Sequence, residues 1–223
     1  MPTTQDYSNK PGLTNKFSTH NARWLPSGFV IALFQELAAL LTRSYLSLAG
    51  GYVVKSHISR LSHRQRYVIA SNHQSLFDPF AIFTLFKWSH RNQLLPIKFM
   101  TIPKVYHRWY AKPVLYLLGC FPAHIREHNY HTYGVEGAVK LLNYGYNICI
   151  FPEGTRTLRA DSNPKPGIVQ ILQEQPYAKL ILVHIEWTYK NFWQRHVKVT
   201  ISLPPDNLDK TDPKAIMDAV YAL

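Results

Sequence analysis

Short apolar runs alternate with helix-like segments along most of this chain, and this alternation constrains the fold more than any other feature. It begins after Gly50-Gly51 and continues almost to the end of the 223 residues. Such alternation is typical of α/β proteins, in which helices cover both faces of a parallel sheet. We therefore expect an α/β domain over residues 50–223, with a mostly parallel sheet flanked by helices.

The length suits one domain with a full apolar core, and no internal repeat or low-complexity tract is visible. Short apolar runs predict strands at Tyr52–Lys55, Tyr67–Ala70, Leu94–Met100, Cys120–Ile125, Asn147–Phe151, Leu180–Trp187 and Val197–Leu203. Helical patterns are found at Phe77–Phe86, His107–Leu118, His131–Asn143, Gly167–Glu174 and Pro213–Ala222.

A different kind of segment precedes this domain. Residues 1–26 are mostly polar with three prolines, and we expect a loose arm without a secretory signal. We expect residues 27–49 to form a membrane-associating segment, because Gly28–Ala49 predicts a long helix that is apolar around most of its circumference. Glu36 and Arg43 make it a poor transmembrane span, which favours an amphipathic helix in the membrane surface. The alternative is a core helix packed under the domain.

The net charge of +12 implies an anionic partner, which can be nucleic acid, an anionic membrane surface or a phosphorylated ligand; simple solubility is the alternative. Between Trp88 and Tyr110, four cations are interleaved with aromatic residues and no acid. This mixture suits a lipid headgroup layer and equally a nucleic-acid groove. Zinc-finger spacing, a Walker loop and an RNA-binding aromatic motif are absent, which disfavours nucleic acid. Cys120 and Cys149 lie in apolar runs, so we expect buried reduced thiols and a location on the cytosolic side.

The segment Asn72-His73-Gln74-Ser75-Leu76-Phe77-Asp78 carries a histidine and, five positions later, a carboxylate. Asp78 is the only acidic residue between Glu36 and Glu127, a span with twelve Lys and Arg. A lone carboxylate in so basic a region indicates a His73 general base whose tautomer and charge Asp78 sets. The segment also lies where a predicted strand ends and a helix begins, the place where α/β folds hold their chemistry. Asn72 and Ser75 are candidate N-caps of that helix.

Spacing alone does not identify such a pair, since the chain has eleven His and thirteen Asp or Glu. A second pair, His131 and Glu136, lies within one predicted helix. Five helical residues turn through about 500°, so these side chains point roughly 140° apart. We interpret that pair as solvated surface.

A second candidate site, Phe151–Thr157, also follows a predicted strand. Gly154 lets a ligand approach the backbone, and Arg156 can hold a phosphate through two parallel hydrogen bonds. Glu153 can orient Arg156 or accept from a substrate hydroxyl. The alternative is a structural turn with a Glu–Arg pair.

A third segment, Gly119–Arg126, passes through a predicted strand and ends in Arg126, either a second phosphate ligand or a surface arginine. In this order the three segments resemble the glycerolipid acyltransferase family, whose best-known members are the 1-acyl-sn-glycerol-3-phosphate acyltransferases. The family blocks Asn-His-x4-Asp and Phe-Pro-Glu-Gly-Thr-Arg are matched in full at Asn72–Asp78 and Phe151–Arg156. The block Gly-x-x-Phe-x-x-Arg is matched loosely at Gly119–Arg126. The resemblance extends from about Gly50 to Leu203.

The resemblance implies that an acyl chain passes from an acyl thioester, either acyl-CoA or acyl carrier protein, to a hydroxyl of a lysophospholipid. The expected acceptor is 1-acyl-sn-glycerol-3-phosphate, which gives phosphatidic acid, at the cytoplasmic face of a membrane. His73 is then the general base and Asp78 its partner. The residues expected to bind substrate are Asn72, Arg126, Glu153, Gly154, Thr155 and Arg156. We expect no cofactor and no metal, since the histidines lack a metal-ligand pattern.

Two departures from the family pattern leave the substrates open. His124 intrudes into the second block, which places Arg126 one residue further from Gly119, and Ile181–Ile185 lacks the proline usual in the fourth block. The acceptor can therefore also be lyso-ornithine lipid, a lysophospholipid with a large headgroup, or a phospholipid in a transacylation. A non-catalytic basic membrane-binding protein is the alternative from another class, although it would need neither His73 nor Asp78.

Overall fold

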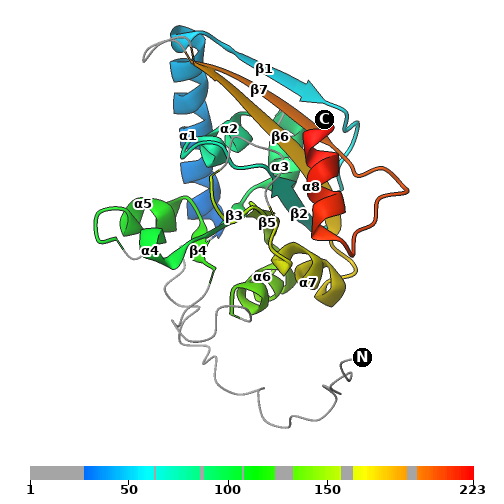
Figure 1. Ribbon diagram of the computed structural model, residues 1–223. Helices are drawn as coiled ribbons and strands as arrows, with labels where there is room; N and C mark the ends of the chain where they lie inside the picture. The colour runs from blue at the N-terminus through cyan, green and yellow to red at the C-terminus, as the bar shows by residue number, and fades with distance from the viewer. Residues whose placement is uncertain are drawn as a thin grey trace, which may run out of the picture.

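The computed structural model of the protein describes residues 28–62, 64–85, 88–106, 108–123, 133–156, 163–189 and 195–223. Within these residues a seven-stranded sheet in the order β1-β7-β6-β2-β5-β3-β4 lies among helices (Figure 1). All neighbouring strands are parallel except β6 and β7. The mostly parallel α/β architecture is thus confirmed. The arm predicted for residues 1–26 lies outside the described residues.

Each predicted strand has a counterpart: β1 (Tyr52–Ser56), β2 (Tyr67–Ser71), β3 (Ile97–Thr101), β4 (Cys120–Pro122), β5 (Asn147–Ile150), β6 (Lys179–Tyr189) and β7 (Arg195–Ser202). The helices are α1 (Gly28–Ala49), α2 (Asp78–Leu85), α3 (Trp88–Leu94), α4 (Pro103–Tyr106), α5 (Lys112–Leu117), α6 (Tyr133–Asn143), α7 (Gly167–Glu174) and α8 (Pro213–Tyr221). Of these, α3 and α4 were not predicted.

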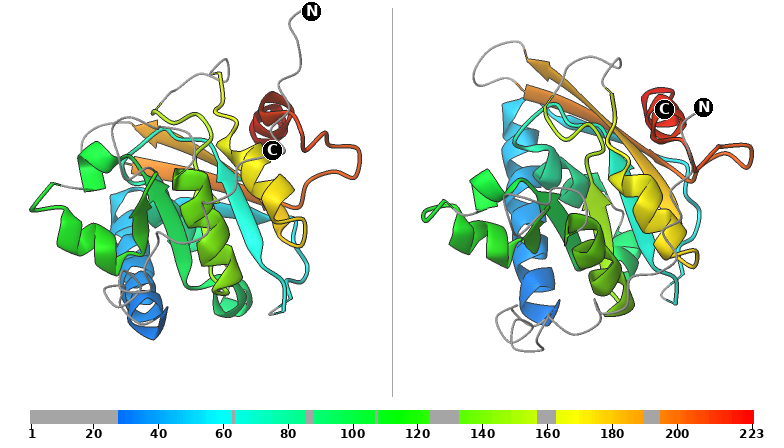
Figure 2. Two further views of the ribbon diagram at one scale, coloured as in Figure 1. Left: turned by 90° about the horizontal axis from the view of Figure 1, so that it is seen from below. Right: turned by 60° about the horizontal axis from the view of Figure 1, so that its bottom comes forward.

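Strand β2 is buried along its whole length and separates two apolar clusters. Because side chains alternate along a strand, Tyr67 and Ile69 face the cluster shared with α1, α2 and α3. Val68 and Ala70 face the cluster shared with α6, α7 and α8. Helices therefore cover both faces of the sheet, as two further views show (Figure 2).

Two predicted starts, those of β3 and α5, are wrong by at least three residues, and proline explains both. The strand expected to start at Leu94 begins only at Ile97, because Leu94 ends α3 and Pro96 lacks the N–H that a sheet ladder needs. The helix expected to start at His107 begins only at Lys112, where Pro113 occupies the first turn. The N–H groups of a first turn have no partner within the helix, so proline is tolerated there. In the interior of a longer helix the missing N–H would remove a hydrogen bond and break the helix.

Helix α1 is docked on the domain through its polar residues as well as its apolar ones. The fully buried Gln35 amide donates to the carbonyls of Ile97 (2.6 Å) and Leu118 (2.8 Å) and accepts from the Ile97 N–H (3.0 Å). Glu36 pairs with Arg91 at 2.8 Å. In length and composition α1 also suffices to cross a membrane, contrary to the expectation drawn from its two charged residues.

The outward face of α1 is strongly apolar. Its exposed large side chains are Phe29, Leu33, Phe34, Leu37, Leu40, Leu41, Tyr45 and Leu48. A cavity of about 240 Å³ opens beside it, between α1, α2 and α5, and Leu41, Phe80 and Val114 are among its lining residues. The Thr42 hydroxyl in this lining is satisfied by the Ala38 carbonyl at 2.7 Å, so the cavity presents hydrocarbon.

Candidate active site

The two predicted motifs meet because their strands are neighbours in the sheet. Strand β2 pairs with β5 on one side and with β6 on the other, all in parallel. The carboxyl ends of parallel neighbours lie at the same edge of a sheet. His73 follows β2 and Glu153 follows β5, so both arrive at that edge. Ser71 pairs with Val183, so the last residues of β6 continue beside the His73 segment.

Asn72 holds the start of this segment against β6. Its buried side-chain amide donates to the Ile185 carbonyl (2.8 Å) and accepts from the Ile185 N–H (2.7 Å), which extends the β2–β6 pairing by one residue. The prediction that Asn72 caps the next helix is therefore wrong, since both polar atoms are engaged elsewhere. Ser75 does serve the helix start: its hydroxyl accepts from the Phe77 N–H at 3.2 Å.

His73 is oriented by a carboxylate on one ring edge and an aromatic ring on one face. Its Nδ1 lies 2.7 Å from Asp78 Oδ2, and its ring stacks on Phe151 with centroids 4.4 Å apart. Because a carboxylate only accepts hydrogen bonds, Nδ1 carries the proton and Nε2 presents a lone pair. The side chain is 20% exposed, so Nε2 can reach a substrate.

The Asp78 carboxylate is completely buried and held by three further donors. Oδ2 also accepts from the main-chain N–H groups of Gln74 (2.7 Å) and Ser75 (2.8 Å). Oδ1 accepts from the indole N–H of Trp187 at 2.7 Å. A buried charge without such partners would cost several kcal/mol, so these donors stabilise the carboxylate in one orientation.

Glu153 joins this centre from the other motif. It is 4% exposed; one oxygen accepts from the His73 main-chain N–H at 2.8 Å and the other accepts from the Tyr221 hydroxyl. Burial raises the pKa of Glu153, the hydrogen bonds from Tyr221 and His73 lower it, and the negative charge of Asp78 raises it again. Both oxygens are occupied within the protein, so Glu153 braces the main chain at His73.

The rest of the second motif is open to solvent. Gly154 has a φ of +70°, a conformation that glycine adopts without strain, and Thr155 and Arg156 are exposed beside it. The Lys165 side chain lies against Gly154, since a Cβ there would sit 3.4 Å from Lys165 Cγ. Two cations, Arg156 and Lys165, therefore flank an exposed turn.

Other predicted residues lie outside the described segments or away from the site. Arg126 and His131 belong to residues 124–132, and a role for Arg126 in binding stays a prediction. The basic and aromatic stretch does not form one surface: Arg91 and Lys98 are buried, whereas Arg108 and Trp109 are exposed. The buried Lys98 ammonium lies over the Tyr146 ring, 4.5 Å from its centroid.

The cysteine prediction is confirmed, since Cys120 and Cys149 are free and buried. Burial raises the pKa of the Cys120 thiol to about 12 and that of Cys149 well above its usual value. Both are therefore inert, protonated thiols. Within the described part of the chain, no group of three or more His, Cys, Asp or Glu side chains could hold a metal ion.

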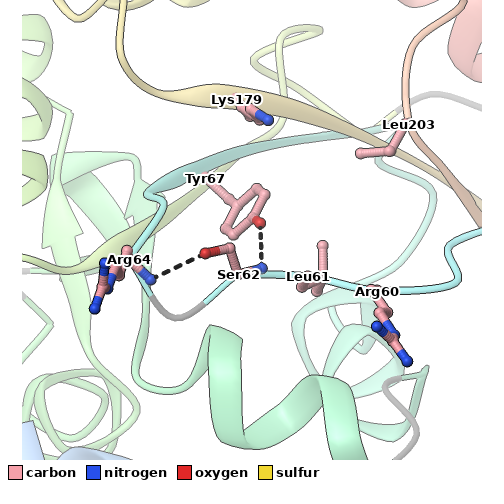
Figure 3. Close-up of a pocket in the computed structure, with 7 residues that line it drawn as sticks. All are labelled: Arg60, Leu61, Ser62, Arg64, Tyr67, Lys179 and Leu203. Atoms are coloured by element: carbon pink, nitrogen blue, oxygen red, sulfur yellow. Dashed lines mark hydrogen bonds between the residues drawn. The ribbon is translucent and has the colours of Figure 1, made fainter.

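A larger cavity, of about 560 Å³, lies beside Tyr67, at the opposite end of β2 from His73. Tyr67 accepts a hydrogen bond from the Ser62 N–H at 2.9 Å, while the side chains of Arg60 and Arg64 extend away from the Tyr67 ring (Figure 3). The cations do not converge on one point, and the length of β2 separates this cavity from the histidine. It is not part of the candidate active site.

The family model for acyltransferases matches residues 53–185, more than half of the chain. The chain belongs to the acyltransferase family. This confirms the resemblance drawn from the motifs. The crystal structure of the 1-acyl-sn-glycerophosphate acyltransferase PlsC from Thermotoga maritima is similar to this acyltransferase, with a TM-score of 0.58 and 18% identity over 87% of this chain and 75% of that one. At that identity the likeness shows the fold. A search of curated proteins found no match.

Several contacts of this acyltransferase site were not predicted from sequence, among them Trp187 on Asp78, Tyr221 on Glu153, and Lys165 on Gly154. Trp187 belongs to the strand predicted at Leu180–Trp187, which the structure has as β6, but 109 positions separate it from Asp78. No local pattern connects residues so far apart, and only the adjacency of β2 and β6 brings them together.

We expect Trp187→Phe to lower kcat by about 10- to 100-fold, because a hydrogen bond to a charged group contributes about 1.5–3 kcal/mol. The phenyl ring keeps most of the packing but lacks the N–H. Steady-state acyl transfer is the measurement, with a thermal melt as the folding check. Tyr189→Phe, which keeps the ring stacked on Trp187, is the matched control. An unchanged kcat in Trp187→Phe would show that the Asp78–Trp187 bond has no part in catalysis.

Proposed function

We propose that this acyltransferase moves a fatty acyl chain from an acyl thioester to a hydroxyl of a lysophospholipid, with 1-acyl-sn-glycerol-3-phosphate as the acceptor. One observation supports this above the others: His73 Nδ1 is held by buried Asp78 while the exposed turn Gly154–Arg156 starts from the next strand. A general base and an anion-binding turn at one edge suit an acceptor that carries both a hydroxyl and a phosphate.

The proposed chemistry uses His73 Nε2 as the base. It takes the proton from the acceptor hydroxyl while the oxygen attacks the thioester carbonyl carbon. Asp78 stabilises the imidazolium that forms. The C–S bond then breaks, the imidazolium returns its proton to the thiolate, and the ester is released. Ser75 is a poor nucleophile for an acyl-enzyme, since its hydroxyl accepts from the Phe77 N–H at 3.2 Å and bonds to no basic side chain in the part of the chain that the structure describes.

The acceptor phosphate is proposed to lie over the exposed turn. The backbone at Gly154 is accessible because no Cβ covers it, and Arg156 supplies a planar guanidinium with two parallel donors. Thr155 adds a hydroxyl and Lys165 a second cation. Glu153 does not engage these groups, because its two oxygens accept hydrogen bonds from the His73 N–H and the Tyr221 hydroxyl.

A membrane location is proposed from exposed apolar surface. The outward face of α1 carries large apolar side chains, and Leu76, Phe77 and Ile102 are exposed just after β2 and β3, at the edge that holds His73. The apolar cavity beside α1 opens on the same helix face. Burying such surface in a bilayer is favourable by about 25 cal/mol per Å². Lipid substrates could reach a site that faces the bilayer without leaving the bilayer.

The first test is a panel of lysolipids with acyl-CoA and acyl carrier protein as donors. We expect transfer to lysophosphatidic acid, and we expect His73→Ala to reduce it by about 10²- to 10⁴-fold because the general base is lost. His57→Ala, at an exposed histidine, is the control. Transfer to another lysolipid instead would replace the proposed acceptor, and near-normal turnover in His73→Ala would remove His73 as the base.

Arg156→Lys should raise the KM for lysophosphatidic acid more than the KM for the thioester donor. Lysine keeps the charge but cannot form the two parallel hydrogen bonds, and binding lost in this way appears in KM. Steady-state kinetics for each substrate are the measurement, with Arg64→Lys as the exposed control. Equal increases for both substrates would assign Arg156 to the phosphates of coenzyme A.

Replacing Leu33, Leu40 and Leu48 with Gln should reduce sedimentation with anionic vesicles by about tenfold or more. Even about 0.5 kcal/mol per side chain amounts to a factor of ten over three positions. These residues are exposed on α1 and away from its docked stripe. Leu203→Gln, an exposed leucine after β7, is the control. If the triple variant sediments as well as the parent protein, α1 is not the membrane contact.

A further inference from the structure

The last helix of the chain ends beside the active site. Asp212 caps α8, and the face formed by Ile216, Met217 and Val220 is buried against the sheet. The helix contacts β2 and β6, the strands that carry the His73 segment and Trp187 (Figure 1). Its final residue, Tyr221, is thereby delivered to Glu153 from the far end of the chain.

The Tyr221 hydroxyl donates to one oxygen of Glu153, and the other oxygen of Glu153 accepts from the His73 N–H at 2.8 Å. The buried carboxylate thus connects α8 to the main chain of the catalytic histidine. The Tyr221 ring meets the His184 ring edge-on, with centroids 5.6 Å apart, and this contact restricts where the hydroxyl can point. A phenolic donor on a buried carboxylate is a directed contact, because burial removes the water that would replace it.

We propose that Tyr221 is a positioning residue for acyl transfer: its hydroxyl orients the Glu153 carboxylate, which in turn fixes the main chain at His73. Glu153 accepts most strongly from the His73 N–H when it is ionised and turned toward it. Tyr221 occupies the second oxygen and prevents the carboxylate from rotating away. This role rests on the proposed function in so far as His73 is the base.

The groups around Glu153 set its pKa, so the role of Tyr221 can be measured as a change in pH dependence. The titratable neighbours are His73 and Asp78 after β2, Tyr221 on α8, His184 on β6 behind the Tyr221 ring, and Lys165 beside the Gly154 turn. Burial and Asp78 raise the pKa of Glu153, while Tyr221 and the His73 N–H lower it. Removal of the Tyr221 hydroxyl therefore raises this pKa further, so Glu153 takes up its proton at a higher pH.

The test is Tyr221→Phe, which keeps the ring and loses only the hydroxyl. We expect kcat to fall by about 2- to 10-fold. We also expect the acid limb of kcat/KM to move to higher pH, because protonated Glu153 no longer accepts firmly from His73. Tyr144→Phe, the same change at an exposed tyrosine, should leave both unchanged.

Two further variants separate positioning from simple packing. In a Glu153→Gln background, Tyr221→Phe should cause little additional loss, since the two residues act through one bond. Val220→Ala loosens the buried face of α8 without touching the hydroxyl, and it should leave the acid limb in place. A wild-type profile in Tyr221→Phe would overturn the proposal. So would an undiminished loss in the Glu153→Gln background, or an equal shift in Val220→Ala.

Any lysolipid that proves to be a substrate can be used, so a wrong acceptor would not affect the result. If no acceptor is acylated, the proposed function fails on its own. The Tyr221–Glu153 link is then measured by urea unfolding of the two single variants and the double variant. Non-additive free energies of unfolding would support the link, and additive ones would overturn it.

Discussion

Four N–H groups converge on the buried carboxylate of Asp78, and the geometry of the site depends on that convergence. They come from the His73 ring, the main chain at Gln74 and Ser75, and the Trp187 indole. A buried charge is tolerated only when it is fully hydrogen-bonded, so the turn after β2 and the end of β6 must stay together. The same bonds leave His73 with one defined tautomer and direct its second nitrogen outward.

The order of the strands brings the other residues of the site to His73. Strand β2 lies between β5 and β6, and a contact on each side steadies the histidine. Phe151 after β5 stacks on the ring, and Asn72 joins the His73 segment to Ile185 on β6. Glu153 adds a bond to the His73 N–H. Such redundancy suits the role proposed for His73, since a base must meet a hydroxyl within hydrogen-bond distance and small misplacements reduce rates sharply.

Helix α1 packs on the domain with one face and exposes apolar side chains on the other. Its buried stripe, with Gln35 bonded to the main chain of two segments, fixes it to the domain. Its outward face leaves large apolar side chains uncovered, which is unusual for the surface of a water-soluble domain. The docked stripe keeps that face in a constant orientation relative to the catalytic edge. This arrangement supports the proposed membrane location of the acyltransferase domain.

The sequence by itself determined the fold class, the seven strands of the described residues, the family and the pairing of His73 with Asp78, because periodicity and closely spaced motifs are local properties. It did not determine what braces the pair. Trp187 and Tyr221 reach the site from more than 60 positions away, and their side chains are ordinary members of a predicted strand and helix. The boundaries of β3 and α5 also depended on context. Only the tertiary structure decided these contacts, because the order of strands in a sheet is set by packing between segments distant along the chain.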